Sequence, residues 1–98
     1  MGEGEERTRS HMNRFSVELT SRARRSLKQV PQKELQKING ALEILRTNPH
    51  PPASKRLRGG NTFRVKIGNY RIIYQVKNSV LIILVIDIGH RREIYRRS

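Results

Sequence analysis

The chain has 98 residues, which is enough for one small domain with a single core but not for two. Its 21 Lys and Arg residues outnumber the 8 Asp and Glu, for a net charge of +13. Such an excess is typical of a protein that meets phosphate, although some small basic domains are merely soluble. Because the chain has no cysteine, disulfides and thiolate metal sites are excluded, and a reducing cytosol is expected.

Membrane and metal functions find no support in the sequence. The longest apolar run, residues 80–86, is far too short to span a bilayer, and the N-terminal region has no apolar segment of the kind found in a signal peptide. The three His and eight acidic residues show no metal-ligand spacing such as HExxH. We therefore expect a cytoplasmic protein with no membrane partner, no metal and no other cofactor.

The first eleven residues, MGEGEERTRSH, show neither periodicity nor core residues. Together with Met12 they end in Ser-His-Met, which resembles a cloning-site scar. We therefore expect residues 1–11 to be an expression tag or a disordered leader, and residues 12–98 to form a single domain. An authentic acidic leader is the alternative. Residues 1–11 carry three Glu and two Arg, which leaves 19 basic and 5 acidic residues, or +14, in residues 12–98.

Residues 15–30 predict a strand followed by a short helix. Phe15, Val17 and Leu19 alternate with polar residues, the two-residue period of a strand with one buried face. Thr20 or Ser21 can cap the helix by accepting a backbone N–H that its first turn leaves free. Basic residues surround a narrow apolar face, which consists of Ala23, Leu27 and Val30.

A second helix is predicted after Pro31, which breaks the first helix and suits the start of the next. Gly40 should cost this helix about 1 kcal/mol relative to Ala, and Asn48-Pro49 ends it. We expect the two helices to form an antiparallel hairpin that packs on a sheet. The apolar residues of the second helix recur at intervals of 3, 4 and 3, the spacing of one helix face, at Leu35, Ile38, Leu42 and Leu45.

Residues 50–61 are rich in Pro and Gly and are predicted to form a loop, after which three strands follow closely. Residues 62–67 and 70–76 flank Gly68-Asn69, a two-residue turn of the kind that closes a tight hairpin. Residues 80–88 are apolar at almost every position, so this strand should be central and covered on both faces.

The tail, residues 91–98, is too short for more than a strand end or one helical turn. The resulting order, β-α-α-β-β-β, predicts an α+β domain in which the helix hairpin packs on one face of a twisted, mostly antiparallel sheet.

The predicted hairpin register brings three cations together. If Gly68-Asn69 is a two-residue loop, Lys66 lies opposite Arg71, and Arg64 projects from the same face, away from the helices. Like charges directly across a ladder are destabilising, so a fold that keeps such a set together is expected to bind an anion there. Cations on an exposed hairpin face are also ordinary, since they discourage aggregation at sheet edges.

The tail adds four Arg, one His and one Tyr within residues 89–97, and it can reach the same face. Metal-free RNA cleavage needs a base for the 2′-hydroxyl, positive charge for the phosphorane and an acid for the 5′-oxygen. Arginine suits the second task through bidentate contacts, and Tyr or Lys could act as the base if nearby cations lowered its pKa. Tyr95 could instead stack on a base, or simply anchor the tail.

Three stretches resemble the RelE/ParE superfamily of toxins from type II toxin–antitoxin systems: KRLRG (residues 55–59), FRVKIGNYRIIY (residues 63–74) and GHRREIY (residues 89–95). Each motif is weak alone, but their order and spacing are specific, and the likeness spans residues 13–97. The resemblance implies a fold of the RelE type, the microbial ribonuclease-type fold.

The resemblance also implies site residues. Lys66 and Arg71 correspond to family residues that meet the scissile phosphate, Arg91 to the arginine at the leaving group, and Tyr95 to a tyrosine that stacks or assists proton removal. Arg64 stands where a lysine is usual, and a guanidinium is a poor general base, so that task would fall to Lys66, Tyr95 or His90. We expect further contacts with RNA or ribosome from Lys55, Arg56, Arg58, His90 and Arg92.

His90 has three readings at this stage: a proton shuttle, because histidine can exchange a proton near neutral pH, a phosphate contact, or an ordinary turn residue. By resemblance the protein is a ribosome-dependent mRNA interferase that cuts in the A site and is blocked by a cognate RelB-like antitoxin. Operator DNA would be bound only through the antitoxin complex. The alternatives are a ParE-like gyrase inhibitor without nuclease activity and a non-catalytic basic module that binds RNA or the ribosome.

Removal of residues 1–11 should leave every activity of the protein unchanged, because those residues contain no predicted core or site position. The measurement is a comparison of the full chain with residues 12–98 in the translation assay described below. Loss of activity in the shorter chain would show that the leader is authentic.

Overall fold

A five-stranded sheet with the order β1-β5-β4-β3-β2 is the framework of the protein. The computed structural model describes residues 14–57 and 60–97, without the side chains of residues 95–97. The strands are β1 (Ser16–Leu19), β2 (Ser54–Arg56), β3 (Thr62–Ile67), β4 (Tyr70–Lys77) and β5 (Ile82–His90). The helices are α2 (Ser21–Lys28), α3 (Gln32–Thr47) and α4 (Arg91–Arg97), with a short 3₁₀ turn at Asn78–Val80.

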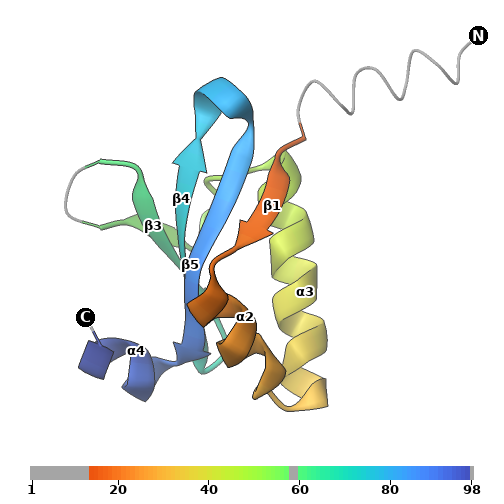
Figure 1. Cartoon of the computed structure of the whole chain (residues 1–98), viewed down its shortest axis with the longest axis vertical. Coiled ribbons are helices and arrows are strands. Elements are labelled where there is room, and N and C mark those ends of the chain that lie inside the picture. Colours follow the sequence, from red (N-terminus) through yellow and green to blue (C-terminus); the bar gives the residue numbers. More distant parts are fainter. Residues whose placement is uncertain (1–13, 58–59, 98) are drawn as a thin grey trace, which may run out of the picture.

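The sheet is mixed, and the helix hairpin covers one of its faces. β1 runs parallel to β5, and the other neighbouring strands pair antiparallel. In Figure 1, α2 and α3 lie on one side of the picture, and α4 leaves the end of β5 on the opposite side. This arrangement confirms the predicted α+β class with a helix hairpin on a largely antiparallel sheet. No helix within the described ranges is long and apolar enough to cross a membrane.

Thr20 joins the first helix to the sheet. Its hydroxyl oxygen accepts the Ala23 backbone N–H at 3.1 Å and so caps α2. Of the two predicted caps, Thr20 and Ser21, the structure therefore selects Thr20. The same hydroxyl donates to the Ile86 carbonyl at 2.7 Å. Ile86 lies in a one-residue bulge of β5, since Ile73 pairs with Asp87 whereas Tyr74 pairs with Val85. The carbonyl of a bulged residue thus finds its partner in the helix cap.

The core lies between the helix hairpin and the sheet. The predicted stripe of α3 is buried at Ile38, Leu42 and Leu45, and Asn48 ends the helix as expected. Most strand residues that face these helices are almost wholly inaccessible, because each strand turns alternate side chains to the same face. The buried strand residues are Phe63, Val65, Ile72, Tyr74, Val76, Ile83, Val85 and Ile88.

Two elements were missed by the sequence analysis. The region 50–61 contains the three-residue strand β2, which no apolar alternation announces and which forms because it pairs antiparallel with β3. The tail forms the seven-residue helix α4 rather than at most one turn. Tertiary contacts stabilise it: Ile94 is buried, and the Arg91 N–H donates to the Asn69 carbonyl at 2.8 Å.

The last strand also differs from its prediction. β5 lies inside the sheet between β1 and β4, but the middle position belongs to β4. It starts at Ile82 rather than residue 80, because Leu81 has a left-handed backbone (φ 54°) that ends the 3₁₀ turn. Ile83, Val85 and Ile88 are fully buried under the helices, whereas Ile82, Leu84 and Ile86 are only half-buried. The prediction that both faces are covered is therefore wrong.

We expect Thr20→Ala to lower the free energy of unfolding by about 1–2 kcal/mol, because it removes the α2 cap and the bond to the bulge. Urea denaturation measures this change. Thr20→Ser keeps the hydroxyl and should lose much less stability. Equal losses in the two variants would show that the methyl group, and not the hydrogen bonds, is what matters at this position.

Candidate functional site

Four cations lie close together on the sheet face opposite the helix hairpin. The ladder pairs Lys66 with Arg71, as predicted, and Lys55 with Arg64. Adjacent strands lie roughly 4.8 Å apart and alternate residues of one strand about 7 Å apart, so the four Cα atoms occupy one small patch. We call Lys55, Arg64, Lys66 and Arg71 the open-face cluster.

The β3–β4 turn holds Arg71 in place. Arg71 is only 5% exposed, and its Nη1 donates to the carbonyls of Tyr70 at 3.1 Å and Gly68 at 3.4 Å. Gly68 has φ 59°, a backbone conformation that glycine adopts without steric cost. The turn therefore presents its carbonyls to the guanidinium, and these contacts offset part of the cost of burying a charge.

Arg64 and Lys66 complete this part of the surface in different ways. Lys66 is exposed and free to reach a ligand, whereas Arg64 is half-buried. The Nε of Arg64 is buried without a hydrogen-bond partner among the described residues, a state that costs roughly 1–3 kcal/mol. An anion with several acceptor oxygens would satisfy donors from both strands, so the arrangement is suited to phosphate.

Asp87 is a residue that the sequence analysis did not single out. It continues the row formed by Lys55, Arg64 and Ile73 across the sheet, and it is buried. Its carboxylate accepts the Ile88 N–H at 2.9 Å and the Ser26 hydroxyl at 3.5 Å, and it lies 3.9 Å from Arg22. It thus anchors α2 to β5. The sequence feature that could have identified Asp87 is an acidic residue inside an otherwise apolar run.

The structure separates two predicted site residues from the cluster. Arg56 pairs with Phe63, which faces the core, and its guanidinium carbon lies 5.6 Å from the Phe63 ring centroid. His90 pairs with Tyr70, and their ring centroids are 5.6 Å apart in an edge-to-face arrangement. His90 shares the face of buried Ile88, because the bulge at Ile86 reverses the alternation of β5.

The remaining predicted residues lie in α4 and in the loop before β3. Arg91 and Arg92 are exposed in the first turn of α4, which contacts both β4 and β5. Tyr95 belongs to α4, four residues after Arg91, but its side chain lies outside the described part of the structure. Arg58 also lies outside the described residues. The predicted roles of these residues stay predictions.

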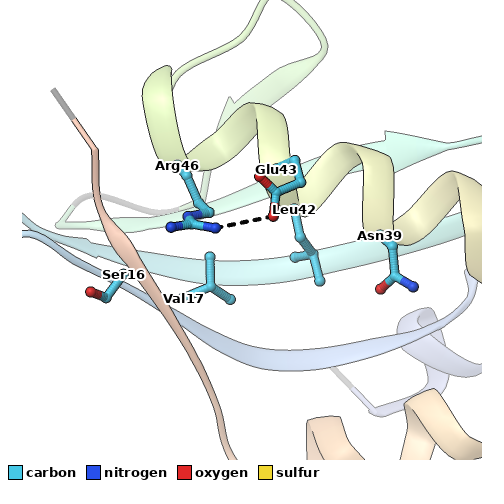
Figure 2. Close-up of a pocket in the computed structure, with 6 residues that line it drawn as sticks. All are labelled: Ser16, Val17, Asn39, Leu42, Glu43 and Arg46. Atoms are coloured by element: carbon cyan, nitrogen blue, oxygen red, sulfur yellow. Dashed lines mark hydrogen bonds and ion pairs between the residues drawn. The ribbon is translucent and has the colours of Figure 1, made fainter. Parts of the chain in front are cut away.

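One cavity is separate from the cluster. It has a volume of about 460 Å³ and lies between β1 and α3. Figure 2 shows Val17 and Leu42 pointing into this space and the ion pair of Arg46 with Glu43 at 3.1 Å above it. Two smaller cavities, of about 320 and 370 Å³, flank the Tyr70–His90 pair. Within residues 14–57 and 60–97, no three His, Cys, Asp or Glu side chains gather as metal ligands would.

The position of Tyr74 excludes its phenol as a general base. Burial raises the pKa of Tyr74, and a hydrogen bond with Ser54 offsets part of that increase. Its hydroxyl donates to the Pro49 carbonyl at 2.7 Å, and its ring stacks near Phe63 on the core side of the sheet. Tyr74 is therefore a core residue held in its neutral form.

Comparisons with known proteins agree with the geometry. Residues 17–95 match the family described as the ParE toxin of the type II toxin–antitoxin system parDE. The chain is similar to the putative toxin RelE1 of Methanocaldococcus jannaschii, with 36% identity over 87 residues that cover 85% of this chain and 97% of that protein.

Solved structures of toxin–antitoxin complexes contain chains with the same fold. The toxin–antitoxin complex RelBE2 of Mycobacterium tuberculosis contains a chain with 27% identity and a TM-score of 0.70, and the match covers 80% of this chain and 99% of that chain. The archaeal RelE–RelB complex of Pyrococcus horikoshii matches with a TM-score of 0.71 at 23% identity, over 79% of this chain and 94% of that one. At 23% identity, the similarity to the P. horikoshii chain shows the fold alone.

Lys66→Gln should raise the free energy of unfolding by about 0.5 kcal/mol at low salt, because it relieves the like-charge pair with Arg71. Added salt should shrink this gain, since screening weakens the repulsion. Thermal or urea unfolding at two ionic strengths provides the measurement. Lys77→Gln is the matched control, because Lys77 is also exposed but lies opposite Ile82. A similar gain in both variants would mean that the cluster carries no local strain.

Proposed function

Because the chain belongs to the RelE/ParE superfamily of toxins from type II toxin–antitoxin systems, we propose that it is an endoribonuclease that cuts mRNA in the ribosomal A site and thereby stops translation. The observation that carries the proposal is the open-face cluster, in which the ladder fixes four cations beside one another despite their repulsion. A fold that keeps like charges together at a cost in stability has a use for them in binding an anion.

The cluster is suited to the charge that develops during attack of a 2′-hydroxyl on the adjacent phosphate. In the proposed mechanism, Lys66, which is exposed, approaches the phosphorane oxygens, and Arg71, which is only 5% exposed, adds positive charge from its fixed place at the turn. Arg64 adds a donor to the same anion. As the 2′-oxygen bonds to phosphorus, the bond from phosphorus to the 5′-oxygen breaks. Arg91, at the start of α4, stabilises the negative charge on the departing 5′-oxygen, which takes its proton from water. Preorganised cations of this kind need no metal for charge stabilisation, so we propose a metal-independent reaction.

The general base is assigned to Lys66 or Tyr95. Arginine keeps its proton in proteins, which leaves Arg64 with an electrostatic role. Tyr74 is buried on the core side, and the ring of His90 faces the helix side of the sheet. Position 95 comes one helical turn after Arg91, and Tyr95 could also stack on the nucleotide. Lys55 and Arg92 would extend the contacts to RNA or ribosome, with Arg56 and Arg58 as further candidates.

The proposed partners follow from the family. The M. tuberculosis neighbour is a toxin–antitoxin complex, which supports a cognate RelB-like antitoxin for this chain. The ribosome and mRNA are the proposed targets, in the cytoplasm, and operator DNA would be bound only through the antitoxin complex.

A second candidate is inhibition of DNA gyrase without cleavage of RNA. The family match is described as a ParE toxin, and that observation favours this alternative. Against it stands the retention of Lys66, Arg71, Arg91 and Tyr95, because a gyrase inhibitor has no need of a nuclease set.

Lys66→Ala and Arg91→Ala should each lower the rate of mRNA cleavage by about 10²-fold, because each removes a cation that meets developing charge. Both residues are exposed, so the fold should tolerate the changes. Arg71→Ala and Tyr95→Phe should also reduce cleavage. The measurement is primer extension on mRNA from a translating extract to which purified protein is added.

Lys77→Ala is the control, since Lys77 is an exposed β4 cation outside the cluster, and it should cut normally. Uncut message together with trapped gyrase–DNA breaks would replace the nuclease proposal with the ParE-like one. Intact message with the protein bound to ribosomes would identify a non-catalytic binding module.

A further inference from the structure

The start of α4 depends on contacts with the sheet. A helix of seven residues is not stable on its own in water, and the first N–H groups of any helix lack partners within it. Here the Arg91 N–H donates to the Asn69 carbonyl at 2.8 Å. The Arg92 N–H donates to Nδ1 of His90 at 3.3 Å. Two backbone donors that the helix leaves free are thus satisfied by a turn carbonyl and by one imidazole.

The imidazole of His90 is itself held from the side. It meets Tyr70 edge to face, with a 5.6 Å centroid separation and a 72° angle between the rings. Tyr70 pairs with His90 across the ladder and follows directly on the β3–β4 turn. The ring that caps α4 is therefore fixed to the same hairpin that holds the open-face cluster.

From these contacts we propose that His90 is a positioning residue, which caps α4 through Nδ1 and so sets where Arg91 lies relative to Arg71. As far as it concerns cleavage, this inference rests on the proposed function. The capping role itself stands on the hydrogen bond to Arg92 and the ring contact with Tyr70.

The turn carbonyls show why the start of α4 matters for the site. The carbonyls of Gly68 and Tyr70 accept from the Arg71 guanidinium, and the carbonyl between them, of Asn69, accepts from the Arg91 backbone. Three consecutive peptide groups thus locate both arginines. His90 secures the next N–H of the helix and keeps its first turn wound at this point. Loss of the cap would loosen Arg91 while leaving Arg71 held.

The same geometry argues against proton transfer by His90. An Nδ1 that accepts a backbone N–H leaves the ring proton on Nε2 in the neutral imidazole. The ring also lies on the helix side of the sheet, where His90 lines both cavities that flank Tyr70. Lys66 and Arg71 occupy the other face. A cap requires only a side-chain acceptor, whereas a proton shuttle requires the imidazole itself. Substitutions at position 90 can therefore distinguish the two roles.

Two substitutions at His90 make that separation. His90→Asn keeps a side-chain acceptor of the type most favoured at a helix N-cap but loses the imidazole ring. His90→Phe keeps an aromatic contact with Tyr70 but has no acceptor. His50→Phe is the matched control, because His50 also contacts an aromatic ring, that of Phe63 at 4.7 Å, but lies far along the chain from α4.

Amide hydrogen exchange at residues 92–94 and primer extension on translated mRNA are measured for each protein. In His90→Phe we expect exchange roughly fivefold faster at residues 92–94, as loss of a cap implies, together with slower cleavage. His90→Asn should retain most of the protection and most of the cleavage. His50→Phe should match the unchanged chain in both measurements.

Full protection and full cleavage in His90→Phe would overturn the capping role, as would loss of protection in His90→Asn. Normal exchange in His90→Asn with cleavage abolished would identify a proton carrier and also contradict the proposal. If even the unchanged chain cuts no mRNA, the proposed nuclease function is wrong, and the exchange data still decide whether His90 caps α4.

Discussion

The pairing of β3 with β4 around Gly68 and Asn69 sets the positions on which the candidate site depends. Its register places Lys66 opposite Arg71, and its turn supplies the carbonyls that hold the Arg71 guanidinium and the backbone of Arg91. A slip of one residue in this pairing would turn every side chain of one strand to the other face. Glycine at position 68 is what permits the tight connection, because the backbone there has a positive φ.

Stability and the proposed chemistry compete on the open face. Like charges on neighbouring strands oppose folding, and Arg71 is nearly inaccessible. The opposite face compensates with a dense apolar core in which eight large side chains are almost completely buried. Thr20 and Asp87 add polar ties between α2 and β5. The apolar core on one face of the sheet thus stabilises the β3–β4 hairpin, whose other face carries the cations. Charged groups that are to bind an anion need such a rigid support.

The one-residue bulge at Ile86 has consequences beyond its own position. Before it, Ile83 and Val85 face the helices; after it, Ile88 and His90 do so. The bulge therefore turns His90 toward Tyr70 and the start of α4, and away from Lys66. It also exposes the carbonyl that Thr20 uses. A strictly alternating strand would have brought His90 to the cluster, where the sequence analysis considered a proton shuttle.

The sequence by itself determined the alternation of β3 and β4, the turn between them, the α3 stripe and the Lys66–Arg71 pairing, because each follows from local periodicity and turn chemistry. The family resemblance added the expected roles of the site residues. The comparisons show the superfamily, and the roles of individual residues stay proposals. Only the tertiary structure decided the rest. β2 has no apolar pattern and exists through its partner β3. Arg56 lies on Phe63, and α4 forms from contacts at Asn69, His90 and Ile94. These features depend on residues distant in the chain, and a bulge that shifts a strand by one position leaves no periodic signal in a run of apolar residues.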